Sequence, residues 1–200
     1  MILNAGRRAL LLAAVVVPVL ALPALPARAA DFELAALMEL LAAVPASKDS
    51  FSETKHSAVL STPLLLKGTL AYTRPDRLEK NVLAPYEERT VVAGNSVTME
   101  NRTLQQNRTF SLASSSPIAA FVESMRATLA GDRAALERHY RVQLEGKAES
   151  WSMTLVPREK KLASLVKRIQ IGGARERLKR IEVEEASGDR SVMLIGPEAP

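Results

Sequence analysis

The chain has 200 residues, a formal net charge of +5 and no cysteine. Without cysteine its stability must come from a hydrophobic core alone. The roughly 170 residues that follow the N-terminal segment described next can supply such a core in one domain. Basic residues do not cluster with aromatic residues, so a nucleic-acid-binding role is not expected.

The first 29 residues have the pattern of a secretory signal peptide. Two arginines precede an apolar run from Ala9 to Leu22, and Ala27-Arg28-Ala29 is a small-residue site that would be cleaved before Ala30. The run contains Pro18 and is shorter than the roughly 20 residues of a membrane-spanning helix, so we favour cleavage over an N-terminal anchor. Loss of the three arginines would lower the net charge from +5 to +2. We therefore expect an exported protein of residues 30–200.

A helix is predicted from Asp31 to Val44, because apolar residues recur there at helical spacing before Pro45. Its apolar side carries Leu34, Leu37, Met38 and Leu41. A first strand is predicted from Phe51 to Leu60.

The segment from Leu64 to Arg74 alternates as a half-buried strand does. One face carries Leu66, Leu70, Tyr72 and Arg74. Pro75 lacks the N–H that a central strand donates, so the Arg74-Pro75 pair should lie at a strand end or bulge.

Further strands of an antiparallel meander follow. Leu78 and Val82 share one face, 86–92 and 97–101 form a hairpin about a turn at 93–96, and Val97 and Met99 lie on one side. Another strand is predicted at 108–112.

Ser116-Pro117 is typical of a helix start, with serine at the N-cap. The predicted helix, 117–130, has an apolar side of Ile118, Phe121, Val122, Met125 and Leu129. After Gly131-Asp132 we expect a short helix through His139. Later strands are predicted around 142–144 and 151–155 and at 165–171, 177–185 and 190–195, with turns at Gly146, Gly172-Gly173 and 187–189.

About ten strands exceed what a flat sheet accommodates without curling. We therefore predict an α+β fold: a strongly curved antiparallel sheet, or incomplete β-barrel, covered by a helical lid made of the helices 31–44 and 117–130. Two alternatives remain for the space between lid and sheet. It is filled by side chains as an ordinary core, or it is open to an apolar guest.

No catalytic site is predicted. His56 and His139 are the only histidines, and no G-x-S-x-G, H-E-x-x-H or glycine-rich phosphate loop occurs. His56 sits among polar residues of a predicted strand and is interpreted as a surface residue. We expect no metal and no cofactor.

The order of these features resembles the periplasmic lipoprotein carriers of the LolA/LolB superfamily. The most specific part is YTRPDRL at 72–78 followed by APYEERTVVAGNSV at 84–97, and the similarity covers most of the chain after residue 31. It implies a half-barrel whose cavity holds the acyl chains of lipoproteins. The chain would then be a soluble periplasmic carrier that shields a lipoprotein or lipid for transfer toward the outer membrane, as a monomer, between an inner-membrane donor and an outer-membrane acceptor.

Pattern and resemblance together assign the site. The predicted acyl cavity comprises Leu66, Leu70, Tyr72, Leu78, Val82 and Met99, and the lid comprises Leu34, Leu37, Met38, Leu41, Ile118, Phe121, Val122, Met125 and Leu129. In the family, an arginine of the Arg-Pro motif binds backbone carbonyls of the lid in the empty state. Arg74 matches that position, so the resemblance implies that Arg74 is a latch, a residue whose hydrogen bonds hold the lid closed in the empty protein.

The sequence departs from the family in two ways. Aromatic residues are few, with Leu78 where the family has an aromatic residue, and little chain follows the predicted strand 190–195. The cargo could therefore be a free acyl chain or glycolipid rather than a triacylated protein. The alternative function is a non-transporting periplasmic sensor or scaffold module on the same fold that binds a protein partner.

Overall fold

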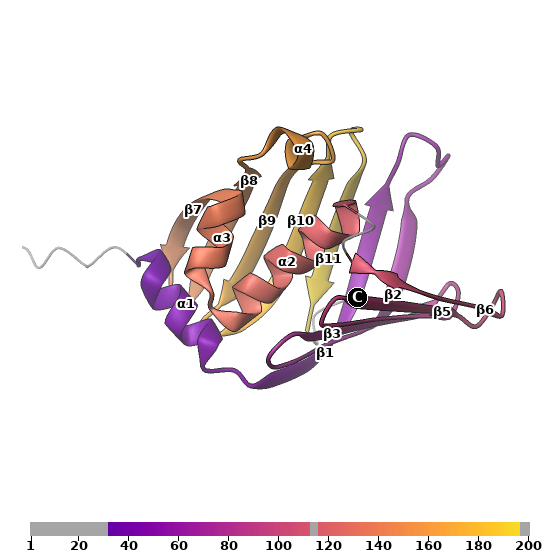
Figure 1. The fold of residues 1–200 in the computed structure, drawn as a ribbon, viewed down its shortest axis with the longest axis horizontal. Helices are drawn as coiled ribbons and strands as arrows, with labels where there is room; N and C mark the ends of the chain where they lie inside the picture. Colours follow the sequence, from indigo (N-terminus) through magenta and orange to yellow (C-terminus); the bar gives the residue numbers. More distant parts are fainter. Residues whose placement is uncertain (1–31, 113–115, 197–200) are drawn as a thin grey trace, which may run out of the picture. The chain divides into compact units, whose positions relative to one another are not determined.

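Eleven strands form one antiparallel sheet in the computed structural model, which describes residues 32–112 and 116–196 (Figure 1). The predicted signal peptide lies outside the described residues. The first six strands are β1 (Ala46–His56), β2 (Leu64–Thr73), β3 (Arg77–Ala84), β4 (Glu88–Ala93), β5 (Ser96–Asn101) and β6 (Gln106–Ser111). The other five are β7 (Tyr140–Lys147), β8 (Ser150–Pro157), β9 (Val166–Ala174), β10 (Arg177–Glu185) and β11 (Arg190–Ile195).

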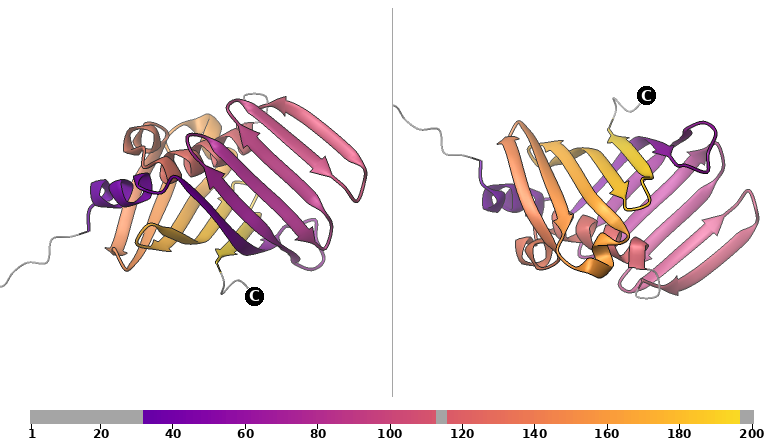
Figure 2. Two further views of the ribbon diagram at one scale, coloured as in Figure 1. Left: turned by 90° about the horizontal axis from the view of Figure 1, so that it is seen from below. Right: turned by 90° about the horizontal axis from the view of Figure 1, so that it is seen from above.

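The sheet consists of two meanders joined at β1. Its order is β6-β5-β4-β3-β2-β1-β11-β10-β9-β8-β7, so each strand lies beside its neighbour in sequence except where β1 pairs with β11. The two meanders face each other at an angle, and β6 and β7 at the ends do not meet (Figure 2). The predicted α+β class with a curved, unclosed antiparallel sheet is confirmed.

Helices cover one face of the sheet (Figure 1). They are α1 (Leu34–Ala42), α2 (Ser116–Ala130), α3 (Arg133–His139) and the short α4 (Lys160–Ala163). α1 packs against α2 and α3, and α2 also contacts α4. The side chain of Asp132 accepts a hydrogen bond from the Ala135 N–H at 2.9 Å, which caps α3 directly after α2 ends.

One part of the buried core joins α1 and α3 with β8 and β9. Six residues of these elements are fully buried in the same core cluster: Leu37, Leu136, Met153, Leu155, Ile169 and Ile171. Side chains therefore fill the space around these six residues. The cavity described below lies beside them, under α2.

The bounds of β1 and the presence of α4 differ most from the sequence-based prediction. β1 begins at Ala46 rather than Phe51 and ends at His56 rather than Leu60, because its polar first half pairs with the last residues of β2. Backbone pairing sets this strand, so hydrophobic alternation could not reveal its start. The short helix α4 was not predicted.

The predicted turn at Gly172-Gly173 is wrong, because both glycines lie inside β9. Gly173 is opposite Trp151 on β8, and a Cβ atom added to Gly173 would lie 2.4 Å from the Trp151 ring. The glycine leaves room for the indole and does not mark a turn.

We predict that Gly173→Ala lowers the free energy of unfolding by about 1–3 kcal/mol, because the added methyl group meets both the Trp151 ring and the Arg177 carbonyl oxygen. The matched control is Gly172→Ala, whose Cβ would make only ordinary contacts of 3.5 Å and longer. Urea unfolding of both variants measures the difference. Equal stability of the two variants would contradict the steric explanation.

A second prediction concerns acid stability on the outer face of the sheet. The Glu79 carboxylate accepts two hydrogen bonds from Arg89, at 3.1 and 3.0 Å, and these above all lower the pKa of Glu79 from 4.5 to about 2. Because the folded-state pKa is the lower one, the stabilisation is present above pH 4.5 and is lost as the pH falls toward 2. Glu79→Gln should lower the free energy of unfolding by about 1–2 kcal/mol at neutral pH and by nothing near pH 2.

The control for this variant is Glu145→Gln, which removes an exposed carboxylate on β7. Urea titrations at several pH values should show a pH-dependent loss for Glu79→Gln and none for the control. A loss that is the same at every pH would rule out the ion pair as its cause.

Candidate functional site

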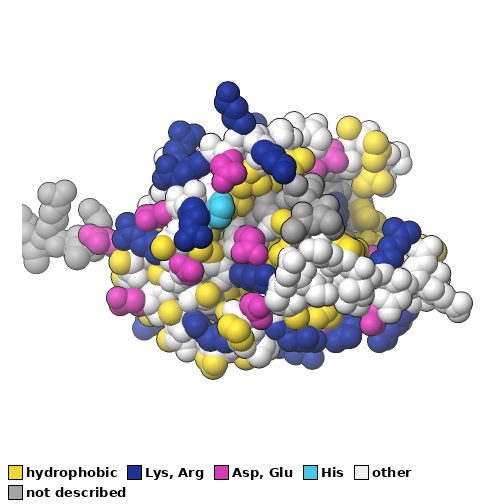
Figure 3. Space-filling view, in the orientation of Figure 1, with side chains coloured by type: hydrophobic (Ala, Val, Ile, Leu, Met, Phe, Trp, Pro, Cys, Tyr) yellow, Lys and Arg dark blue, Asp and Glu magenta, His cyan; other side chains and the backbone are white. Residues whose placement is uncertain are grey.

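A cavity of about 850 Å³ lies between α2 and the sheet, on the side of β1 to β5, β10 and β11. This volume is in the upper range of ligand pockets in proteins. Hydrophobic side chains are visible in a hollow on this face of the molecule (Figure 3). The space is therefore large enough for a small-molecule guest.

Much of the lining is apolar. α2 contributes Phe121, Val122, Met125 and Leu129, and the sheet contributes Leu70, Tyr72, Leu78, Val92, Val97, Met99, Ile181, Val183, Met193 and Ile195. The helical spacing on α2 and the alternation on the strands direct these side chains to the same space. Such a lining favours an apolar guest.

The structure brings most of the predicted cavity residues together. Leu70, Tyr72, Leu78 and Met99 line the cavity. Leu66 and Val82 are buried in the core and are not among the lining residues. Their strands supply both the floor of the cavity and the core beside it.

The predicted lid residues divide between two roles. Leu41, Phe121, Val122, Met125 and Leu129 line the cavity. Leu37 and Met38 are buried in the core and Leu34 packs against it. The side chain of Ile118 lies outside the described residues, as does that of the predicted N-cap Ser116. α1 therefore adds mainly core, and α2 forms most of the roof.

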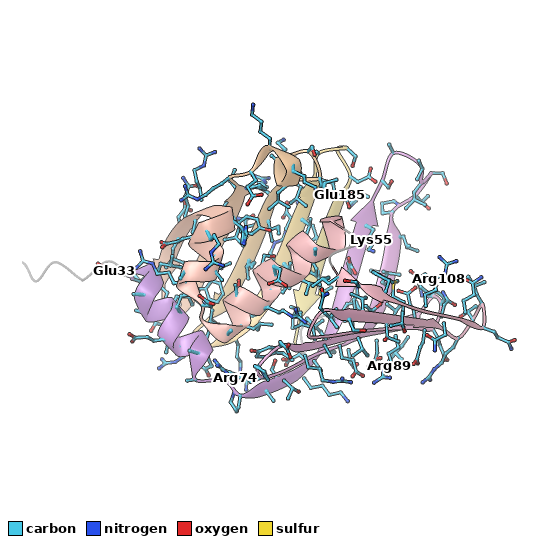
Figure 4. All side chains as sticks on the ribbon, viewed as in Figure 1. Glu33, Lys55, Arg74, Arg89, Arg108 and Glu185 are labelled. Carbon is cyan, nitrogen blue, oxygen red and sulfur yellow. The ribbon has the colours of Figure 1, made fainter. Side chains whose placement is uncertain are left out.

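Arg74 connects the end of β2 to the ends of two helices (Figure 4). Its Nε donates to the Val44 carbonyl at 3.1 Å, and its Nη2 donates to the carbonyl oxygens of Ala42 and, at 3.3 Å, Ala130. Ala42 and Ala130 are the last residues of α1 and α2, and Val44 follows α1. At such helix ends the backbone oxygens lack helical partners and the helix dipole favours a cation. One guanidinium group thus holds both helix ends beside the sheet.

Arg126 makes a similar connection that the sequence interpretation missed. It lies on α2, and its Nε donates to the Asp76 carbonyl at 3.0 Å while its Nη2 donates to the Gly94 carbonyl at 2.6 Å. The Asp76 carboxylate accepts the Gly94 N–H at 3.0 Å, which ties the two turns together. The only sequence signal was a basic residue beside the apolar side of the predicted helix.

Charged residues also line the cavity, which the sequence interpretation did not anticipate. The Lys80 ammonium is hydrogen-bonded to Glu53, whose side chain is 5% exposed, and Lys55 lies 3.9 Å from the same carboxylate. Burial is the main cause that lowers the pKa of Lys80, and Glu53 opposes it. Lys80 lies between Leu78 and Val82 in the alternation, so its inward direction was readable from the sequence; that of Glu53 had only Phe51 to indicate it.

The mouth of the cavity lies near the loop between β1 and β2. Ser57 and Leu60 of this loop line the cavity, and the side chains of Val59 and Leu60 are exposed. In the described parts of the chain, no group of three His, Asp or Glu side chains is placed to hold a metal ion. None of the helices in those parts has the length and apolar character needed to cross a membrane.

Comparison with known proteins gives one match to a protein family. A family model described as "Outer membrane lipoprotein carrier protein LolA-like" matches residues 24–199. A search of curated proteins gives no match.

Solved structures with a similar fold share little sequence with this chain. A LolA superfamily protein from Nitrosomonas europaea is 11% identical with a TM-score of 0.43, over 80% of this chain and 90% of that one. A chain in the complex of the CwlD amidase of Clostridioides difficile with the GerS lipoprotein is 8% identical with a TM-score of 0.38, over 75% and 82%. A chain in the MucA/MucB complex of Pseudomonas aeruginosa is 9% identical with a TM-score of 0.41, over 84% and 58%.

Proposed function

This chain belongs to the LolA-like family of outer membrane lipoprotein carrier proteins, and we propose that it is a periplasmic carrier that shields acyl chains of a lipid or lipoprotein in the cavity under α2. The observation that supports this most is the cavity of about 850 Å³ with an apolar roof and a partly apolar floor. After cleavage of its signal peptide, the protein would receive its guest from an inner-membrane donor and deliver it to an outer-membrane acceptor. The role is one of binding rather than catalysis.

The free energy of burial limits how such a carrier works. Each buried methylene contributes about 0.8 kcal/mol, so a single long acyl chain contributes on the order of 10 kcal/mol. A guest held so tightly leaves slowly, so a carrier needs a free-energy contribution that opposes binding. Contacts that exist only in the closed, empty protein supply such a contribution, because binding of the guest breaks them.

Arg74 and Arg126 are the residues to which we assign this contribution. Both bind backbone carbonyl oxygens across the boundary between helices and sheet. A guest that displaces α2 would break these charge-assisted hydrogen bonds, each worth about 1.5–3 kcal/mol in a protected site and less where water competes. Arg74 is then the latch that the family resemblance implies, and Arg126 is a second one.

We predict that the purified protein binds a hydrophobic fluorescent probe and that an added acyl ligand displaces this probe. Native mass spectrometry should detect an acyl compound bound to the purified protein. Met125→Glu, which puts a charge into the roof, should weaken probe binding at least about tenfold. Glu39→Gln, which removes an exposed carboxylate on α1, should leave it unchanged. Circular dichroism checks that both variants fold.

Absence of any acyl ligand and of probe binding in the folded protein would refute the carrier function. Recovery of a stable protein complex that survives Met125→Glu would instead favour the sensor or scaffold alternative. The two outcomes need different readouts, so one set of variants separates the two functions.

We further predict that Arg74→Leu and Arg126→Leu each bind the probe several-fold more tightly and release it more slowly, because opening breaks fewer hydrogen bonds. Arg77→Leu is the control, since Arg77 is an exposed arginine on β3 that pairs with Glu79 on the outer face. Stopped-flow release of the probe measures the effect. Unchanged release rates would remove both arginines from the mechanism.

A further inference from the structure

A row of charged residues with alternating sign crosses the floor of the cavity. Its members are Glu88 on β4, Lys80 on β3, and Glu53 and Lys55 on β1, and all four line the cavity. The strand registers place them on one face, since Lys80 is opposite Thr90, Glu53 is opposite Met193 and Lys55 is opposite Ser191. The floor therefore has a polar section between its apolar parts.

The sheet is shaped to allow this row. Lys80 reaches Glu53 across β2 at the level of Gly68, which has no side chain to block the path. On the way, the Lys80 ammonium lies 5.1 Å from the centre of the Phe51 ring, within the range of a cation–π contact. A methyl group at position 68 would meet the Asn81 carbonyl oxygen at 1.7 Å, so only glycine fits there.

Contact with the hydrocarbon chain of a guest would be unfavourable for these charged side chains. An ion pair that loses its contact with water pays a desolvation penalty of several kcal/mol per ion unless other polar groups replace the water. The side chains of Lys80 and Lys55 are still 26% and 44% exposed, so they keep some hydration in the empty cavity. A guest that covers this section gains most if it brings a polar group.

The groups next to Glu53 that can still donate hydrogen bonds are the ammonium groups of Lys80 and Lys55. An ammonium group has three donors. Within residues 32–112 and 116–196, Lys80 has one hydrogen-bond partner, Glu53, and Lys55 lies 3.9 Å from Glu53, beyond hydrogen-bond distance. The Glu53 carboxylate is already engaged, so the group that this section lacks is an anion.

Six other carboxylates of the described residues line the cavity: Asp49, Glu79, Glu88, Glu176, Glu185 and Asp189. Asp189 lies close to Lys55, since it precedes Arg190, which is opposite His56, but its two oxygens already accept hydrogen bonds from the Ser57 hydroxyl at 2.6 Å and the Ala58 N–H at 3.2 Å. Asp49 is six residues back along β1, about 20 Å in an extended strand. Glu88 is three strands away, about 14 Å at the usual strand spacing. Lys55 is also the member of the row closest in sequence to the mouth residues Ser57 and Leu60.

We propose that the cavity takes a lipid with an anionic head group, a carboxylate or a phosphate, which binds Lys55 with Lys80 beside it while the acyl chain lies along the apolar lining under α2. This inference rests on the proposed carrier function and adds the chemical class of the guest. Lys55 then determines specificity at the mouth, and the ion pair of Glu53 with Lys80 keeps the neighbouring floor polar.

The test compares palmitoyl ligands that differ only in the head group, by displacement of a neutral fluorescent probe below the micellar concentration. Palmitate and palmitoyl lysophosphatidate supply the two anions, monopalmitoylglycerol is neutral and palmitylamine is cationic. We expect one or both anions to bind at least about tenfold more tightly than the neutral and cationic ligands. The stronger of the two anions identifies the carboxylate or the phosphate as the head group.

Lys55→Gln should remove about tenfold of the affinity for the anions and leave monopalmitoylglycerol unchanged. Lys67→Gln, an exposed lysine on the opposite face of β2, is the matched control and should change neither. Both variants alter partly or fully exposed side chains, and circular dichroism verifies folding.

Equal binding of anionic and neutral ligands, or an equal loss of both in Lys55→Gln, would overturn the head-group inference and leave the carrier function standing. Tighter binding of palmitylamine would overturn it too, and would point to one of the lining carboxylates, such as Asp49, Glu88 or Asp189, as the polar contact. Failure of every palmitoyl ligand to bind the folded protein would overturn the carrier function together with the inference.

Discussion

The pairing of β1 with β2 on one side and with β11 on the other holds the two meanders in one sheet. Without it, β2 to β6 and β7 to β11 would be separate ribbons with no common concave face. The same strand supplies Glu53 and Lys55 to the cavity floor. A polar, sequence-distant strand pairing therefore sets both the curvature of the fold and the character of the space that it encloses.

The helices are held over this face by contacts that do not depend on helix side chains alone. Arg74 reaches from the sheet to helix carbonyls, and Arg126 reaches from α2 to turn carbonyls, so each connection has a main-chain acceptor. Apolar contacts favour burial of α2 against the sheet but do not specify its position, because they are not directional. The hydrogen bonds of the two arginines are directional and fix that position. Together they allow a roof that is well placed and still separable from a floor that is partly empty.

Much of the fold was predictable from the sequence, because hydrophobic alternation marks strands that are half buried. β10 and β11 have the predicted bounds, and α2 and α3 lie where capping and spacing indicate them. β1 and the glycines of β9 were misjudged, since backbone pairing and the bulk of Trp151 determine them and neither leaves a local signal. For the site, the contacts of Arg74 with the helix ends agree with the resemblance, and its role as a latch stays a prediction. The charges on the floor depend on neighbours across strands, which alternation in β1 barely indicates.

The close packing of α1 and α3 with β8 and β9 has a mechanical consequence for the whole molecule. Close-packed interiors resist compression and expansion, whereas a partly empty space adapts at little cost. A change in cavity volume would thus fall on α2 and the β1 to β5 half, while α1 and α3 stay seated on fully buried residues such as Leu37, Leu136 and Ile169. One side of the space between helices and sheet is therefore rigid and the other can deform. Guests of different size would be accommodated by movement of α2 and the strands β1 to β5 alone.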